Sequence, residues 1–256
     1  MPHPTRTVVL DQVGSTNTEA FERAKAGEPG PLWIMARRQT EGRGRSGRHW
    51  TSEPGNLHAS LLIRLPCAQA VVHQLSLLAG VAAIDAIRKA SGAPVAGLRL
   101  KWPNDVLVGE AKCAGILAES LSGAHAGEVI AVIGVGMNLA WHPAGLDRAA
   151  THLAAHGVAA SPEAILEALD GTMAHWLDVW ACGAGFARVR AAWLERAGPI
   201  GERLGVHAGH DRLEGTFLDL DTDGGLIIRD LHGLQRKLIY GDVTLGASQP
   251  PESEGR

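Results

Sequence analysis

The segment QTEGRGRSGRHW, residues 39–50, alternates glycine with arginine and ends on a tryptophan. Glycine has no Cβ, so three glycines let the backbone turn tightly or approach a ligand closely. Three arginines can surround phosphate oxygens, and the tryptophan adds a flat apolar face. These residues are Gly42, Gly44, Gly47, Arg43, Arg45, Arg48 and Trp50. We expect a loop that encloses an anion and that is mobile until a ligand orders it, because its arginines are unpaired.

The segments around this arginine loop (residues 42–50) alternate between strand and helix patterns. Short apolar runs predict strands over residues 32–36 and 57–65, and an earlier strand over residues 8–13. A helix is predicted from Ser15 to about Ala26, with Thr16 and Glu19 as a capping box. The loop therefore connects two ordered elements.

The middle of the chain predicts a buried helix over residues 71–90 and then three short strands. Those strands cover residues 98–102, 106–108 and 114–118, and a further apolar strand covers residues 129–135. Residues 109–112 resemble a hairpin turn, which would bring Lys112 close to Asp105.

The C-terminal part predicts two helices followed by a small β module. Ser161 and Pro162 form a helix start, and apolar residues then recur at helical spacing until Gly198. Short strands separated by turn clusters follow. We expect three segments, a domain over residues 1–199, a β module over residues 200–246 and a disordered tail over residues 247–256.

Composition restricts the classes of function. The 256 residues carry 24 basic and 27 acidic side chains, a net charge of −3, so anion binding must be local. No apolar run reaches the roughly 18 residues of a membrane span, and no export signal is present, so a cytoplasmic location is expected. Three distant cysteines, Cys67, Cys113 and Cys182, favour neither a disulfide framework nor a zinc site.

Candidate phosphate-binding residues fall on four separate segments. They are the arginine loop, Asn104 with Asp105, Lys112 and Asn138. Neither a P-loop nor a dinucleotide fingerprint occurs, so side chains must hold the nucleotide. A nonenzymatic nucleic-acid module, using the arginines with Trp50, remains an alternative from these residues alone.

Five motifs in this order are similar to those of biotin protein ligases. They are residues 15–17, GRGRSGRHW at 42–50, KWPND at 101–105, residues 112–117 and GVGMN at 134–138. The resemblance implies an α+β catalytic domain with a mixed sheet, like that of class II aminoacyl-tRNA synthetases, followed by a small SH3-like β-barrel. It also implies that biotin and ATP give biotinyl-5′-adenylate and pyrophosphate, and that a lysine of a biotin carboxyl carrier protein then takes the biotinyl group.

The resemblance further implies roles for single residues. Biotin would contact Ser15, Thr16, Asn17, Gln39, Gly42, Arg43, Lys112 and Gly115. The nucleotide would contact Arg43, Gly44, Arg45, Arg48, Trp50, Asn104, Lys112, Gly136 and Asn138. Lys112 and Arg45 would be catalytic, and so would Asp105, which would orient Lys112 or hold Mg²⁺ on the phosphates.

The chain also departs from the family pattern. His58 stands where many relatives have tyrosine, and Cys113 where a larger aliphatic residue is common. The first predicted strand begins within about ten residues of Met1, so we expect no repressor-type helix-turn-helix and no operator binding. A lipoate ligase shares the fold and the type of reaction, but uses another arginine motif that is not found here. Monomer and sheet-edge homodimer both stay open.

Overall fold

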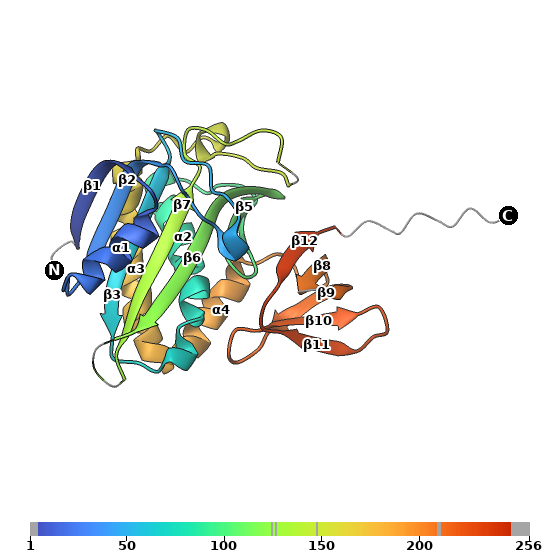
Figure 1. The fold of residues 1–256 in the computed structure, drawn as a ribbon. Helices are drawn as coiled ribbons and strands as arrows, with labels where there is room; N and C mark the ends of the chain where they lie inside the picture. Colours follow the sequence, from blue (N-terminus) through green and yellow to red (C-terminus); the bar gives the residue numbers. More distant parts are fainter. Residues whose placement is uncertain (1–4, 124, 126, 147, 209–210, 247–256) are drawn as a thin grey trace.

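The structure is a computed structural model that describes residues 5–123, 125, 127–146, 148–208 and 211–246. A seven-stranded mixed sheet forms the larger part of the molecule (Figure 1). In spatial order its strands are β1 (Arg6–Val13), β2 (Leu32–Gln39), β3 (Leu57–Leu65), β7 (Val129–Met137), β6 (Ala111–Ser122), β5 (Asp105–Val108) and β4 (Leu98–Lys101). Only β1 and β2 are parallel.

Helices cover both faces of this sheet. Helix α1 (Thr16–Lys25) connects β1 to β2 and lies on one face, whereas α2 (Gln74–Ser91) and α3 (Pro162–Trp180) lie on the other (Figure 1). Helix α4 (Phe186–Arg196) packs against α2 and α3. Single turns of 3₁₀ helix are η1 (Arg45–Gly47), η2 (Gln69–Val71), η3 (Leu153–His156) and η4 (Ala181–Gly183).

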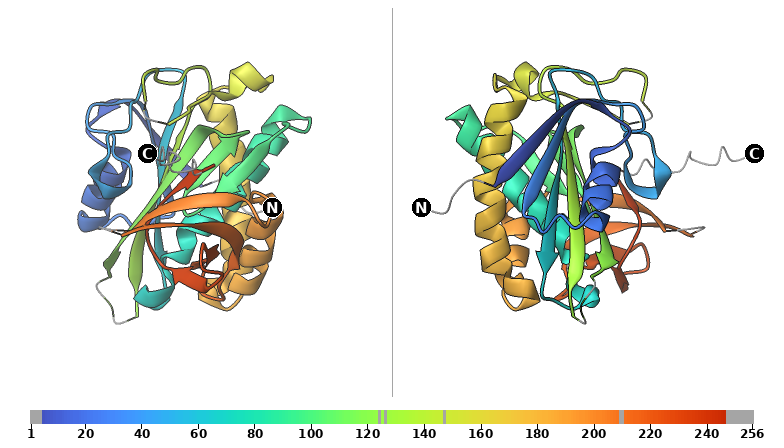
Figure 2. Two further views of the ribbon diagram at one scale, coloured as in Figure 1. Left: turned by 90° about the vertical axis from the view of Figure 1, so that its right-hand side faces the viewer. Right: turned by 60° about the vertical axis from the view of Figure 1, so that its left-hand side comes forward.

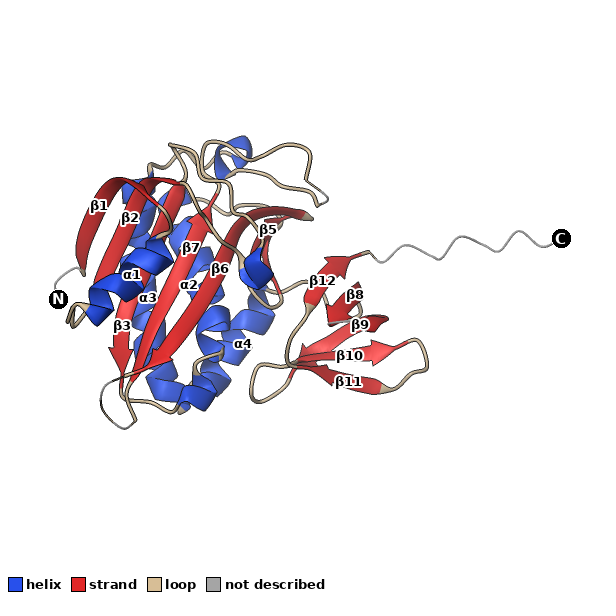
Figure 3. Cartoon of the chain, in the orientation of Figure 1, coloured by secondary structure: helices blue, strands red, loops and turns tan. Residues whose placement is uncertain are grey.

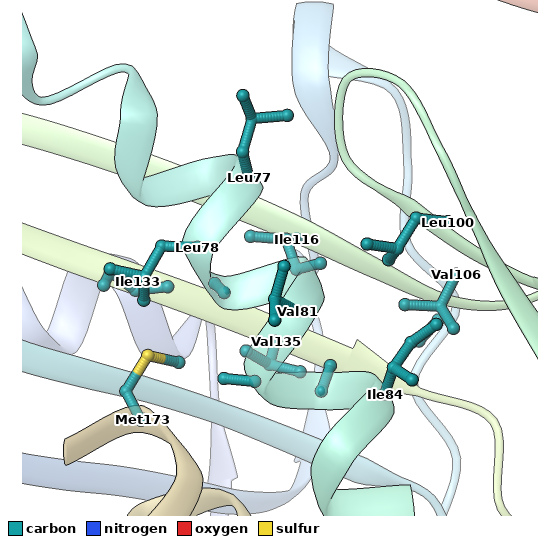
Figure 4. Close-up of a cluster of buried hydrophobic side chains, with 14 of the residues drawn as sticks. Leu77, Leu78, Val81, Ile84, Leu100, Val106, Ile116, Ile133, Val135 and Met173 are labelled. Atoms are coloured by element: carbon teal, nitrogen blue, oxygen red, sulfur yellow. The ribbon is translucent and has the colours of Figure 1, made fainter. Parts of the chain in front are cut away.

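Alternation along β2 explains this layering. Leu32 and Ile34 pack with Ala20 of α1, while Trp33 and Met35 belong to the larger core beneath α2 and α3. Successive strand residues point to opposite faces, so a continuous apolar run needs cover on both sides. Figure 4 shows the larger core, in which α2 residues such as Val81 face Ile133 and Val135 of β7.

A second sheet of five antiparallel strands forms the C-terminal module. Its strands, in spatial order, are β11 (Gln235–Leu238), β10 (Leu226–Asp230), β9 (Asp211–Leu220), β8 (Arg203–Ala208) and β12 (Asp242–Leu245). Trp102 Nε1 donates to the Gly224 carbonyl at 3.1 Å, and Lys101 Nζ donates to the Val243 carbonyl at 2.9 Å. The module therefore lies against the end of β4, as Figure 2 shows.

The predicted fold class is confirmed, and several element boundaries agree with the sequence. Strand β3 has both predicted ends, and Ser161 Oγ accepts from the Ala164 N–H at 3.1 Å as the predicted cap of α3. The predicted strand over residues 114–118 is longer, because β6 begins at Ala111 directly after a tight turn at Gly109, whose φ is +63°. The predicted tail, residues 247–256, lies outside the described residues.

The predicted capping box at the start of α1 is wrong. Ser15 is the N-cap, and its side chain makes no capping hydrogen bond. The Thr16 hydroxyl instead donates to Gln39 Oε1 at 3.1 Å, so it connects α1 to the end of β2. A polar side chain at a helix start is therefore used for a tertiary contact.

The helices do not suit a membrane span. Among the described residues, none of them combines the length and the apolar character that crossing a bilayer would need.

Candidate active site

Several loops gather at one end of the large sheet (Figure 3). A cavity of about 330 Å³ opens on the α1 face of this sheet. Its floor is one row of paired residues that crosses five strands. The row runs from Lys101 on β4 through Asp105, Gly115 and Gly136 to His58 on β3. Facing residues in adjacent antiparallel strands point to the same side, so all five positions belong to the cavity side of the sheet.

The two glycines in this row make room for Trp50. A Cβ added at Gly136 would lie 2.5 Å from Trp50 Cε2, and one added at Gly115 would lie 3.2 Å from Trp50 Cζ3. The indole therefore lies against bare backbone. Its Nε1 is buried and has no hydrogen-bond partner among the described residues, which leaves a donor for a ligand.

A β-bulge lets Lys112 and Gly115, three residues apart on β6, both face this floor. Asp105 pairs with Gly115 and Val106 with Ala114, but Leu107 pairs with Lys112, so Cys113 is an extra residue on β6. Leu107 is two residues from Asp105, so its partner Lys112 faces the same side of the sheet as Asp105. The bulge brings Gly115, three residues further on, to that side as well. The backbone of Lys112 is held in turn by the Ala149 carbonyl and the Thr151 N–H, both at 2.9 Å.

Asp105 is the buried counter-ion of this region. Its side chain is 6% exposed, and its carboxylate lies 2.5 Å from Lys112 Nζ, 3.0 Å from Lys101 Nζ and 4.0 Å from Arg148 Nη1. Burial alone would raise the pKa of Asp105, but attraction to Lys112 and Lys101 outweighs it, so this pKa lies below its usual value. Burial also lowers the pKa of Lys112, and the Asp105 carboxylate opposes that change.

A neutral polar cradle forms the other end of the cavity, at the start of α1. Gln39 Oε1 accepts from the backbone N–H of Thr16 at 2.8 Å, and Gln39 Nε2 donates to Ser52 Oγ at 3.0 Å. Ser60 Oγ is fully buried, 2.7 Å from Thr16 Oγ1 and 2.6 Å from Asn17 Oδ1. Such a network fixes its donors and acceptors before any ligand arrives.

Asn17 and Glu119 connect this cradle to the arginine loop. The Asn17 amide donates to the Leu117 carbonyl at 3.2 Å and to Glu119 Oε2 at 2.7 Å. The same Glu119 oxygen lies 3.5 Å from Arg43 Nη2. Because the Asn17 amide already has partners on both its oxygen and its nitrogen, its contacts indicate a positioning role for this residue.

The arginine loop is a closed hairpin whose arginines all have acceptors. Trp50 N–H donates to the Gly42 carbonyl at 2.8 Å, and Gly44 N–H donates to the Arg48 carbonyl at 2.7 Å. Arg45 Nη1 lies 3.4 Å from Asn104 Oδ1 and 3.3 Å from the Gly241 carbonyl. The expectation of unpaired arginines is therefore wrong, because side chains and carbonyls distant in the sequence supply the missing partners.

The C-terminal module takes part in this closure. Arg48 forms an ion pair with Asp242, the first residue of β12, and this contact raises the pKa of Arg48 while Asp242 has a pKa below its usual value. Burial raises the Asp242 pKa by itself, and the hydrogen bond from Arg48 outweighs that effect. Two segments about 200 residues apart therefore form one wall of the cavity.

Fourteen of the sixteen predicted site residues line this cavity. The two exceptions are Gly42 and Asn138. A Cβ at Gly42 would collide with the Trp50 carbonyl, so this glycine allows the base of the loop to close. The Asn138 amide donates to the Thr151 carbonyl at 3.0 Å and is buried, so it fastens the segment after β7 and does not face the cavity.

The surroundings of Asp105 do not suit a magnesium site. Its carboxylate faces two ammonium groups and a guanidinium, and no cluster of three potential metal ligands occurs within the described part of the chain. Mg²⁺ prefers an octahedron of oxygen ligands. The geometry therefore favours the alternative role of Asp105, which is to orient Lys112.

Several residues at the cavity were missed by the sequence reading. His58, Arg148 and Asp242 line the cavity itself. Ser60 and Glu119 lie directly behind the lining, where both are hydrogen-bonded to Asn17. One signal was available for two of them, since His58 and Ser60 lie two apart in a mostly apolar strand and must point to the same face. The others come from distant segments, and no local pattern indicates them.

His58 should make the stability of the protein depend on pH. It is buried, and burial lowers its pKa despite a contact of 3.3 Å between Nε2 and the Glu53 carbonyl. The unfolded chain binds this proton near pH 6.5 and the folded chain does not, so stability falls as the pH drops below about 6.5, by up to about 1.4 kcal/mol per pH unit. We expect urea unfolding between pH 5.5 and 7.5 to show a weaker pH dependence in His58→Gln than in the wild type.

The matched control for that experiment is the exposed His232. His232→Gln should keep the wild-type dependence. If the free energy of unfolding changes with pH equally in His58→Gln and in the wild type, His58 is not a neutral buried imidazole.

Family models match two regions of the chain. Residues 9–138 match the biotin/lipoate A/B protein ligase family, and residues 200–246 match the biotin protein ligase C-terminal domain. The chain is 39% identical over 239 residues to a biotin–[acetyl-CoA-carboxylase] ligase of Paracoccus denitrificans, covering 89% of this chain and 95% of that protein. A ligase of the same name from Mycobacterium tuberculosis is 32% identical, over 92% of this chain and 87% of that protein.

Solved structures agree with these matches. The biotin protein ligase of Aquifex aeolicus in complex with biotin and ATP superimposes with a TM-score of 0.77 at 25% identity, over 94% of this chain and 98% of that one. The Leishmania major biotin protein ligase with biotinyl-5-AMP gives a TM-score of 0.64 at 26% identity, over 92% and 99%. With the family models and the sequence identities, these likenesses show that the chain belongs to the biotin protein ligase family.

Proposed function

We propose that this protein is a biotin protein ligase that makes biotinyl-5′-AMP from biotin and ATP and passes biotin to a lysine of a biotin carboxyl carrier protein. The observation that carries the proposal is one cavity with two unlike ends. A neutral, preorganised cradle lies at Thr16, Gln39 and Ser60, and a cationic chamber lies around Arg45, Arg48 and Lys112. A ligand with an uncharged polar ring and a carboxylate suits the cradle, and a nucleotide suits the chamber.

In the first step a carboxylate oxygen of biotin attacks the α-phosphorus of ATP. A carboxyl–phosphate bond forms, the bond from the α-phosphorus to the bridging oxygen breaks, and pyrophosphate leaves. Two anions must meet, so the main catalytic contributions are positioning and charge neutralisation. Lys112 is held by Asp105 at the floor between the two ends, where its ammonium group can touch both the carboxylate and the α-phosphate.

In the second step the neutral amine of the carrier lysine attacks the acyl carbon and an amide bond forms. The bond from that carbon to the AMP oxygen breaks, and AMP and one proton leave. Since an acyl adenylate reacts readily with water, the closed loop has to exclude solvent until the carrier arrives. Trp50 packed on the glycine floor and the Arg48–Asp242 contact support such a role. Biotin and ATP enter as substrates.

The partner and the remaining expectations are also proposals. The relatives named as acetyl-CoA-carboxylase ligases support a carboxylase carrier domain as the acceptor. We also propose a cytoplasmic location, and either a monomer or a homodimer formed through an edge of the large sheet. Residues 1–199 and 200–246 are proposed as the two domains.

The direct test is ATP-dependent biotinylation of a purified carrier domain, followed by mass spectrometry of the intact carrier. We expect one biotinyl group per carrier, and none on a carrier whose target lysine is replaced by arginine. Labelling without ATP, or none with it, would contradict the proposal.

Arg45→Gly should separate the two steps. Arg45 connects the loop to Asn104 and to the Gly241 carbonyl, so its loss should loosen the closed loop while Lys112 and Asp105 stay in place. We expect adenylate synthesis to continue at a reduced rate and biotinyl-5′-AMP to escape into solution, measured by chromatography of the filtrate after each turnover. If the ratio of free adenylate to labelled carrier stays at the wild-type value, Arg45 does not retain the intermediate.

A further inference from the structure

Arg148 is distinguished from the other cations of the cavity by its lack of a close partner. Six lysine or arginine residues line the cavity, namely Arg43, Arg45, Arg48, Lys101, Lys112 and Arg148. The first five each have an acceptor within 3.5 Å. Arg148 has only the 4.0 Å approach of Nη1 to Asp105 and makes no hydrogen bond with the described residues. Its N–H groups are thus free to bind an anion.

The backbone around Arg148 is nevertheless fixed beside Lys112. The Lys112 N–H donates to the Ala149 carbonyl, and the Thr151 N–H donates to the Lys112 carbonyl, both at 2.9 Å. Leu153 N–H then donates to the Asn138 carbonyl at 2.9 Å, which fastens the segment to the end of β7. Arg148 directly precedes Ala149, so its side chain is placed at the cavity beside Lys112 while its head group keeps free N–H groups.

The approach of Arg148 to Asp105 and its charge place it in the chamber and away from the cradle. Its side chain is 44% exposed, against 19% for Lys112, so it lies nearer the opening. The positive charge of Arg148, like those of Arg45 and Arg48, lowers the pKa of Asp242. It also lowers the pKa of Lys112. Arg43 and Glu119, which adjoin the cradle, lie at the other end. Lys112 therefore stands between the cradle and Arg148.

We propose that Arg148 binds the β- and γ-phosphates of ATP and the pyrophosphate that they become. This assignment deepens the proposed function and rests on it. In the displacement at the α-phosphorus, the leaving group departs on the side opposite the attacking biotin carboxylate. The guanidinium of Arg148, at the chamber end, lies where the negative charge of the departing pyrophosphate needs neutralisation. Arg148 has no role once pyrophosphate has left.

The test compares Arg148→Ala with the wild type in the two half-reactions separately. In biotin-dependent exchange of pyrophosphate into ATP, we expect the KM for pyrophosphate and that for ATP to rise about 10- to 100-fold, as for loss of charge-assisted hydrogen bonds. Transfer of biotin from isolated biotinyl-5′-AMP to the carrier should be unchanged, and so should the affinity for biotinyl-5′-AMP, which lacks both phosphates. Arg148→Lys should recover part of the loss, because it keeps the charge.

The matched control is Arg188→Ala on α4, an exposed arginine whose side chain forms no hydrogen bond or ion pair with the described residues. It should behave as the wild type. Two results with an active wild-type enzyme would show that Arg148 does not bind the leaving group. In the first, Arg148→Ala keeps the wild-type KM values for pyrophosphate and ATP; in the second, it slows transfer from isolated biotinyl-5′-AMP. The proposed function would stand in both cases. A wild-type protein without biotin-dependent exchange would overturn both the role of Arg148 and the proposed function.

Discussion

Lys112→Ala is expected to lower biotin-dependent pyrophosphate exchange by about 10²- to 10³-fold, equivalent to about 3–4 kcal/mol of lost transition-state stabilisation. The ammonium group of Lys112 lies at the centre of the cavity floor, 2.5 Å from Asp105 and 5.5 Å from the centre of the Trp50 ring. Without it, the carboxylate and the α-phosphate meet with no cation between them. The loss should appear mainly in kcat, because the charge matters most as the new bond forms.

Stability measurements separate this effect from misfolding. Asp105 keeps its 3.0 Å contact with Lys101 after the substitution, so the variant should fold and should still bind biotin in the cradle. Lys112→Met, which retains most of the side-chain volume, should lose as much activity as Lys112→Ala. An exchange rate near that of the wild type in either variant would refute the role given to Lys112.

Asp105→Ala is expected to have the largest effect on stability, about 3–5 kcal/mol, as for removal of one partner from a buried ion pair. Two partly buried ammonium groups, those of Lys101 and Lys112, would lose their common buried counter-ion. The melting temperature should fall by roughly 6–20 °C for a chain of this size. The pKa of Asp105 is lower in the folded state, so this contribution is present at neutral pH and is lost as the pH falls through the folded pKa.

The control for this variant is Asp221→Ala. Asp221 also forms an ion pair with a lysine, Lys237, but that pair is at the surface of the C-terminal module. We expect almost no change in melting temperature there. Similar melting temperatures for Asp105→Ala and the wild type would mean that the carboxylate of Asp105 does not stabilise the cavity floor.

The local features of this protein could be predicted from sequence because they depend on short-range patterns. The bounds of β3 follow from one apolar run, and the turn at Gly109 brings Lys112 to Asp105 as the spacing indicates. Fourteen of the site residues carried over from the family motifs line one cavity, although their individual roles remain predictions.

Other features depend on contacts between distant segments. The row that joins Lys101 to His58 requires the strand order β4-β5-β6-β7-β3, which no local pattern contains. The partner of Arg48 comes from β12, about 200 residues later. For Asn138 the motif predicts a contact with the nucleotide, which stays a prediction, and only the structure shows that its amide donates to the Thr151 carbonyl.

The central claim is that one cavity neutralises two anions so that a carboxylate can attack a phosphate. Its most direct test is exchange of labelled pyrophosphate into ATP by the purified wild-type protein, with biotin, with lipoate and with neither acid. The account predicts exchange that depends on biotin, with lipoate giving only the background rate. Exchange supported equally by lipoate, or absent with biotin, would contradict it.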